Sequence, residues 1–194
     1  NIFQPTIAML TLNSWKNLGG WYNPVKGIEK TADFEKIKAS YKGGVCIPLK
    51  KRYTPNANSK YLYHYDINSS YPTVMMKEIP IAIKKYEIVS EYKTISLKKS
   101  PLLQLKNNCL YEVIFRFKDK IIFPYFPIKV KEGLVYVQES LKEKQWIWGE
   151  ELNYALISGH LEILEVFSFF EFFMEKIFQN YIQMLWEERK KEKD

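Results

Sequence analysis

The sequence predicts an α+β fold, in which helices and one acid-bearing strand precede a mainly β segment that leads to a long final helix. Three observations support this. Apolar and polar residues alternate along 110–117, as in a strand with one buried face. Helical periodicity marks 31–40 and 170–193. Breaker residues separate these segments, and the texture changes to short strands after Pro80.

The segment before Pro80 should contain short helices around the acid-bearing strand. Thr31 and Glu35 suit the first turn of a helix, and Pro72 is tolerated in the first turn of another. A polar loop at 50–60 is expected to join two strands. The expected helices are 7–15, 31–40 and 69–77, and the expected strands are 45–49 and 61–66.

The segment after Pro80 should be mainly β. Two prolines make 121–130 an edge-type strand, and Gly159 occupies the C-cap position of a helix. Phe173, Ile177 and Tyr181 would share one face of the final helix. The expected strands are 110–117, 121–130, 134–138 and 161–167, and the expected helices are 150–158 and 170–193.

Composition restricts the function classes. Hydrophobic residues make up 46% of the 194 residues, which indicates a globular protein, and the net charge of +7 favours an anionic partner such as nucleic acid. The basic residues are 26 Lys and 3 Arg, as in products of A+T-rich organellar, plasmid or viral genomes. Charges interrupt the apolar stretch 161–186, so no membrane span is expected. Cys46 and Cys109 lack zinc-ligand spacing and are expected to be reduced thiols.

The stretch 63–72 is the first candidate site. It places one carboxylate, Asp66, at the end of an expected strand, before a turn of small polar residues and Tyr71-Pro72. Such an arrangement can hold a divalent metal ion and a nucleotide. A lone Asp at a strand end is also an ordinary turn former or helix cap, and that alternative stays open on the residues alone.

The second candidate is the sequence Tyr41-Lys42-Gly43-Gly44, followed by the basic residues Lys50, Lys51 and Arg52. The glycine pair is compatible with a helix C-cap and turn. It also suits close approach of the backbone to nucleic acid, where nearby cations would contact phosphates without regard to sequence. The lysine-rich run 84–99 is read either as a solvated face or as a region of a DNA groove.

The two stretches together resemble motifs of family B DNA polymerases. Asp66, Ser69, Tyr71 and Pro72 match motif A, while Ser70 stands where that motif has Leu. The Tyr-x-Gly-Gly sequence about two dozen residues earlier is similar to the motif that links the exonuclease and polymerase regions of protein-primed members. The resemblance implies a partial polymerase palm, a short antiparallel sheet with helices, plus a β-rich insertion after motif A.

The resemblance also implies roles for individual residues. Asp66 would bridge two Mg²⁺ ions, and the carbonyl of Ile67 would be a further ligand. Ser69, Ser70 and the amides of the turn would face the triphosphate, and Tyr71 would lie under the incoming sugar and exclude a 2′-hydroxyl. The residues implied in contact with the DNA template and primer are Tyr41, Lys42, Gly43, Gly44, Lys50, Lys51 and Arg52.

The resemblance further divides the chain into three segments: residues 1–80 with both motifs, a β-rich insertion at 81–166 that contacts the terminal priming protein, and a helix at 167–194 leading toward motif B. Taken alone, 146–160 is a structural helix with a tryptophan anchor. Motifs B and C are not found in these residues, so the chain alone is expected to be inactive without the remainder of the polymerase.

Two other interpretations remain at this point. The chain could be a non-catalytic polymerase remnant that binds RNA or proteins in an organellar complex such as a mitochondrial ribosome. It could also be a basic globular protein with chance motif matches. A mitochondrial location, or another organellar, plasmid or viral origin, is expected for the polymerase.

Overall fold

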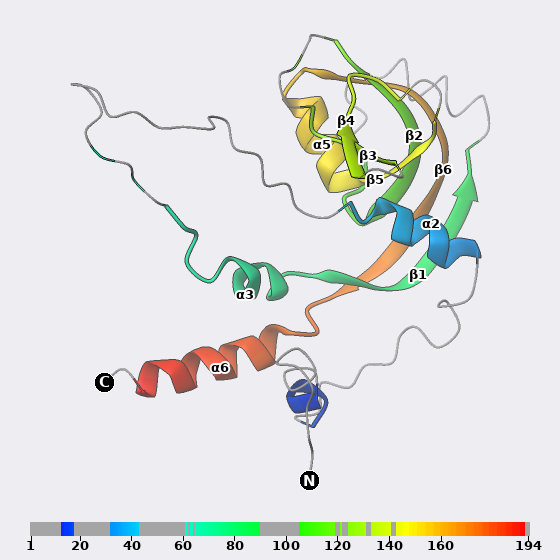
Figure 1. Ribbon diagram of the computed structural model, residues 1–194. Helices are drawn as coiled ribbons and strands as arrows, with labels where there is room; N and C mark the ends of the chain where they lie inside the picture. Colours follow the sequence, from blue (N-terminus) through cyan, green and yellow to red (C-terminus); the bar gives the residue numbers. More distant parts are fainter. Residues whose placement is uncertain are drawn as a thin grey trace.

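The computed structural model describes residues 13–17, 32–42, 61, 63, 65–89, 105–118, 121, 124–130, 133–140 and 143–192. It confirms a mixed α+β architecture, with a curled antiparallel sheet and helices (Figure 1). The elements are α2 (Ala32–Ser40), α3 (Ser70–Met75), β1 (Ile79–Ile88), β2 (Cys109–Phe117), β3 (Pro127–Val130), β4 (Gly133–Tyr136), β5 (Gln145–Trp148), α5 (Gly149–Ile157), β6 (Leu161–Glu175) and α6 (Gln179–Lys191).

The main sheet has four strands in the order β1-β6-β2-β5, and β3 and β4 form a separate two-stranded sheet. All pairings are antiparallel. Along the β2–β6 pair the register shifts twice, once between Glu112 and Val113 and once between Ile114 and Phe115. Such bulges bend a sheet and change which residues of the bulged strand face inward. They allow the long strand β6 to follow the curve of the sheet in Figure 1.

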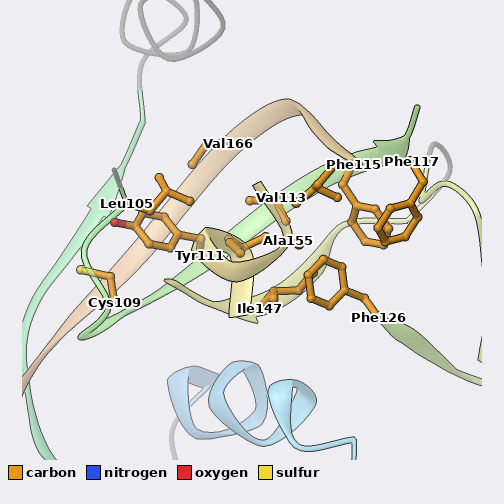
Figure 2. Packing of buried hydrophobic residues seen from close by; sticks show 12 residues of the cluster. Leu105, Cys109, Tyr111, Val113, Phe115, Phe117, Phe126, Ile147, Ala155 and Val166 are labelled. Carbon is orange, nitrogen blue, oxygen red and sulfur yellow. The ribbon is translucent and has the colours of Figure 1, made fainter. Parts of the chain in front are cut away.

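The inner face of the sheet holds the larger core. The odd-numbered residues of β2 from Cys109 to Phe117 are buried there with Leu152 and Ala155 of α5, which lies inside the curve of the sheet. Figure 2 shows Phe115, Phe117 and Phe126 gathered at one end of this core. The expected burial of Tyr111, Val113, Phe115 and Phe117 on one face is therefore confirmed, while Leu110 at the start of the strand is buried on the other face.

The opposite face of the sheet is covered by α2. Leu110, Trp146, Phe170 and Phe172 form a second buried cluster, and Ile37 of α2 packs against it. Because β5 is an edge strand, its contact with α2 protects one margin of the sheet. A third cluster lies away from the sheet, where residues of α6 pack with Met75, Met76 and Trp15.

Several expected elements are confirmed. Helices form at α2, α3 and α5, and residues 13–17 are helical, past the expected end of the first helix. Gly159 has φ +79°, the left-handed conformation of a helix C-terminus. The expected edge strands pair with each other as β3 and β4. The start of the helix at 7–15, the strand at 45–49, the loop at 50–60 and Cys46 lie outside the described residues.

Three expectations were wrong in some respect. Residues 170–175 belong to β6, and the final helix begins only at Gln179. The run of phenylalanines favours a strand, and β6 is central, with neighbours on both sides. Trp146 lies on β5 and not on a helix. The described residues of 61–66 form no strand, because a strand needs a hydrogen-bonded neighbour and the described regions of the chain offer none there.

Candidate nucleotide and nucleic-acid site

Within the described residues, the Asp66 stretch is anchored through the helix that follows it, α3. Residues 65–67 have no regular structure, and α3 begins three residues later. Met75 and Met76, at the end of α3, pack into the cluster around Tyr181 and Ile182 of α6. In Figure 1, α3 therefore lies beside α6 and not on the sheet. The chain then enters β1, whose first residue pairs with the last residue of β6.

A strained turn joins Asp66 to α3. Ser69 has φ 53° and ψ 38°, and among the described residues it is the one non-glycine residue with positive φ. A single residue in this conformation costs roughly 1 kcal/mol. Hydrogen bonds offset that cost: the Ser70 amide donates to the Ile67 carbonyl at 3.2 Å, and the Thr73 amide and hydroxyl donate to the Ser69 carbonyl at 3.0 and 2.9 Å. The turn reverses the chain between the carboxylate and the tyrosine of the motif.

The residues of this stretch are open to solvent. Asp66 and Ile67 are exposed, Ser69 and Ser70 are half-buried, and Tyr71 is 85% exposed. Tyr63 and Tyr65 are also exposed, and their ring centroids lie 6.3 Å apart in a stacked arrangement. The structure thus brings the predicted nucleotide-site residues together on an open surface that carries aromatic rings and one carboxylate.

The residues fit a divalent cation in kind but not in number. Carboxylate and carbonyl oxygens suit Mg²⁺, and the Ile67 carbonyl, which accepts one hydrogen bond from Ser70, keeps a second lone pair. No group of three or more His, Cys, Asp or Glu side chains with metal-binding geometry occurs among the described residues. Asp66 and Ile67 could therefore supply some ligands of a metal site that needs further carboxylates.

The second predicted constellation follows α2. Tyr41 is 79% exposed, so its ring is open to contact. The Lys42 Nζ donates a hydrogen bond to the Gln145 Oε1 on β5, at 3.2 Å. Because α2 contacts β5 while α3 contacts α6, the structure places the two constellations on different elements. Gly43, Gly44, Lys50, Lys51 and Arg52 lie outside the described residues, so their role stays a prediction.

The helix α5, which lies within the stretch 146–160, has a mixed outer face. Tyr154 and Ile157 are exposed there, and the Tyr154 ring lies 6.2 Å from that of Tyr125. Desolvation raises the pKa of Glu151, against the opposing effects of a hydrogen bond from the Trp148 amide and of the Lys42 charge. The Trp148 amide precedes the first turn of α5, so Glu151 supplies half of a capping box.

The described lysines of the run 84–99 pair with acids. The Lys84 Nζ lies 3.1 Å from the Glu171 Oε1, and Lys85 pairs with Glu87. The Lys106 Nζ joins the same Glu171 oxygen at 3.2 Å. These lysine side chains are about half exposed or more, although each contacts a carboxylate. His160 is exposed, and His64 lies outside the described residues.

Sequence reasoning missed the contact that fixes the start of α5. The Asn153 side chain accepts from the Leu105 amide at 3.1 Å and donates to the Leu105 carbonyl at 2.5 Å. A Cβ on Gly149 would lie 2.0 Å from the Lys106 carbonyl oxygen. A polar residue at a core position of the α5 pattern was the available signal, since buried amides require partners.

The structure also bears on the predictions made for the cysteines and for a membrane span. Cys109 is free and buried, in agreement with a reduced thiol. Burial raises its pKa, and the thiol also interacts with the Tyr111 hydroxyl. No helix in the described regions of the chain has the length and hydropathy that a membrane crossing requires.

Comparisons with known proteins extend these observations. The family model described as DNA polymerase type B, organellar and viral, matches residues 1–194. No curated protein sequence matches the chain. Among solved structures, an orthorhombic crystal form of phi29 DNA polymerase is similar, with a TM-score of 0.53 and 17% identity over 90% of this chain. Phi29 DNA polymerase in a ternary complex with primer-template DNA and incoming nucleotide substrates matches with a TM-score of 0.50 and 16% identity, also over 90% of this chain.

The match covers 30% of the phi29 polymerase chain in both structures, so this chain spans about a third of that enzyme's length. At these identities the structural likeness shows the fold, and the family assignment rests on the family model. That model covers the whole chain. The chain belongs to the organellar and viral family of type B DNA polymerases.

Proposed function

We propose that this chain carries a portion of the polymerising site of a protein-primed DNA polymerase that joins nucleotides by two-metal catalysis. The observation that carries the proposal is the exposed stretch from Asp66 to Tyr71. It presents one carboxylate, a left-handed turn at Ser69 and an aromatic ring at the start of α3 on one open surface. The family match supports this chemistry, and the alternative of a non-catalytic remnant is not favoured by any observation.

Asp66 would be a ligand of Mg²⁺, with the Ile67 carbonyl as a further ligand. When bound, the metal neutralises charge on the phosphates and on the attacking and leaving oxygens. The Ser70 amide is engaged with Ile67, so contacts to the triphosphate fall to the other amides of the turn and to the hydroxyls of Ser69 and Ser70. The exposed Tyr71 ring would lie under the sugar and exclude a 2′-hydroxyl.

The other regions of the chain would bind macromolecules. Tyr41, Gly43 and Gly44, together with Lys50, Lys51 and Arg52, would follow the template strand, as contacts with a backbone do not depend on sequence. The phi29 enzyme of the ternary complex binds primer-template DNA, which supports DNA as a partner here. Residues 81–166 would contact the terminal protein, between the motif-bearing segment 1–80 and the segment 167–194. The second metal carboxylate would come from the remainder of the polymerase, in a mitochondrion, a linear plasmid or a virus.

The first experiment compares primer extension by the chain alone with extension by a polymerase that includes it. We expect no template-dependent synthesis from the chain alone with Mg²⁺, since Asp66 is one carboxylate where two metals need more. In the complete polymerase, Asp66→Asn should reduce the rate at least about 100-fold, because metal stabilisation of the transition state contributes several kcal/mol. Synthesis by the isolated chain, or an active Asp66→Asn enzyme, would sink the proposal.

Glu78→Gln is the matched control for Asp66→Asn. Glu78 is also an exposed carboxylate, and it lies just beyond α3 and outside the proposed metal site. The control enzyme should keep the activity of the unaltered one. If both variants lose activity equally, the loss comes from a general change in charge and not from a metal ligand.

The second experiment tests the sugar contact. In the complete polymerase, Tyr71→Ala should raise the use of ribonucleotides relative to deoxyribonucleotides by about tenfold or more, as expected when a shape-excluding side chain is removed. Tyr154→Ala, which removes another exposed tyrosine, should leave the ratio unchanged. An unchanged ratio in Tyr71→Ala would remove this role from the proposal.

A further inference from the structure

Lys42 makes a contact that its place in the Tyr-x-Gly-Gly sequence does not predict. Its ammonium donates to the Gln145 Oε1 at 3.2 Å, across 103 residues of sequence. Gln145 is 6% exposed and begins β5, where it pairs with Val113 of the central sheet. The acceptor therefore belongs to a rigid element and holds the lysine at one place on the edge of the sheet.

The rest of α2 is held on the same surface. Ile37 packs against the cluster of Leu110, Trp146 and Phe170. The Lys36 Nζ lies 4.7 Å from the centre of the Tyr86 ring on β1. Packing thus fixes the body of the helix, and the bond from Lys42 fixes the chain two residues after the helix ends.

The charge of Lys42 also acts on a carboxylate of the protein. The positive charge lowers the pKa of Glu151 on the first turn of α5, against the raising effects of desolvation and of Glu150. If Lys42 moved to a phosphate, the Gln145 amide oxygen would lose its donor. An unpartnered buried acceptor is costly, so the lysine is held in place on the protein.

The Tyr41 side chain is exposed, whereas the neighbouring Lys42 is bonded to β5. The side chain of Tyr41 is 79% exposed, and its backbone amide donates to the Lys38 carbonyl at 3.1 Å, which continues the end of α2. The ring is thus presented outward from a fixed backbone.

We propose that Lys42 is a positioning residue, whose bond to Gln145 holds the end of the α2 segment on the edge strand β5 so that the neighbouring Tyr41 faces the nucleic acid. The inference rests on the proposed function in naming nucleic acid as the ligand. It differs from the family resemblance, which groups Lys42 with the residues that contact DNA directly.

The test measures binding of a fluorescent single-stranded oligonucleotide as a function of salt, for the unaltered chain, Lys42→Met, Lys42→Arg and the control Lys38→Met. Lys38 lies on α2 and is exposed, with a loose pairing to Glu35 at 3.8 Å. Lys42→Met should weaken binding about 3- to 10-fold, the size of one hydrogen bond, with an unchanged salt slope. Lys42→Arg should restore affinity, and Lys38→Met should not reduce it. A direct phosphate contact would instead lower the salt slope by about one.

Two further measurements test the bond between Lys42 and Gln145 without nucleic acid. In a double-mutant cycle of urea stability, Gln145→Leu and Lys42→Met should be non-additive, because each removes the same bond. In NMR titrations, Lys42→Met should raise the pKa of the Glu151 carboxyl further, since it removes the opposing charge. Additive stabilities with an unmoved Glu151, or a salt slope lowered by about one, would overturn the inference. If the unaltered chain bound no oligonucleotide, the proposed function would fail, while the cycle and the titration would still decide the Lys42–Gln145 anchor.

Discussion

The curled sheet and the Asp66 stretch are opposite in how they are held. Phe115 and Phe170 of the sheet are fully buried, and both faces of the sheet are covered, one by α5 and the other by α2. Tyr65 and Tyr71 of the stretch are more than four-fifths exposed. Burial of the sheet therefore supplies most of the free energy of folding. The stretch with the proposed chemistry contributes little to stability and presents its side chains to solvent.

The largest expected effect is a loss in the free energy of unfolding when a core residue of the sheet is truncated. Phe170→Ala should lower the free energy of unfolding by about 3–5 kcal/mol, because it leaves a cavity between Trp146, Phe172 and Tyr86. Urea denaturation followed by tryptophan fluorescence measures the loss. Phe173→Ala, on the same strand but exposed, is the control and should change stability far less. Equal losses from both variants would contradict the assignment of the core.

The second effect concerns the start of α5. Gly149→Ala should destabilise the fold by about 3 kcal/mol, because its Cβ would lie 2.0 Å from a backbone oxygen that cannot move aside as a side chain could. Gly159→Ala meets nothing within 4 Å and suffers only its positive φ, at about 1 kcal/mol. Thermal unfolding of the two variants measures the difference. A loss no larger in Gly149→Ala than in Gly159→Ala would mean that the 105–109 turn does not pack against α5.

Local pattern explains which elements of the fold the sequence predicted. The alternation along 110–117 and the glycine after α5 each act within one element, so β2 and α5 were expected correctly. Residues 170–175 were misassigned because Phe173 fits both a period of two and a helical period with Ile177. Only pairing with β1 and β2 decides for the strand, and pairing depends on residues distant in sequence.

Prediction of the candidate site from the sequence was limited in the same way, because contacts between distant residues have no local signature. The residues from Asp66 to Tyr71 are contiguous, so the sequence could group them without knowing the fold. The bond between Lys42 and Gln145 joins residues that only the sheet brings together, and the Lys–Gln pair has no sequence signature. The left-handed Ser69 was also not foreseen, because serine seldom adopts positive φ and the turn depends on the bonds of Ser70 and Thr73.

The third effect depends on pH and disappears in acid. Two lysines, Lys84 first and then Lys106, lower the pKa of the Glu171 carboxyl below its ordinary 4.5. A carboxyl with a lowered pKa in the folded state adds stability above its ordinary value, and that stability is lost as the pH falls through the folded value. Glu171→Gln should therefore be less stable than the unaltered chain at pH 7, and the gap should close in acid.

Urea midpoints at a series of pH values check this expectation, with Glu175→Gln as the control. Glu175 is an exposed carboxylate at the end of the same strand and therefore a matched control for the loss of one negative charge. A gap between Glu171→Gln and the unaltered chain that stays constant down to pH 2.5, roughly two pH units below the ordinary value, would show that the two lysines do not perturb the carboxyl.

The smallest expected changes in stability are those caused by substitutions in the Asp66 stretch. Asp66→Asn and Tyr71→Phe should change the free energy of unfolding by no more than about 0.5 kcal/mol, as is usual for exposed positions without buried partners. Ser69→Gly should stabilise slightly, by a few tenths of a kcal/mol or more, because glycine adopts the left-handed conformation without strain. Urea midpoints measure all three changes. A large loss in Asp66→Asn would mean that the carboxylate supports the fold. Unchanged stability would separate the chemistry of this stretch from folding, so that loss of polymerase activity in the same variant could be assigned to the site itself.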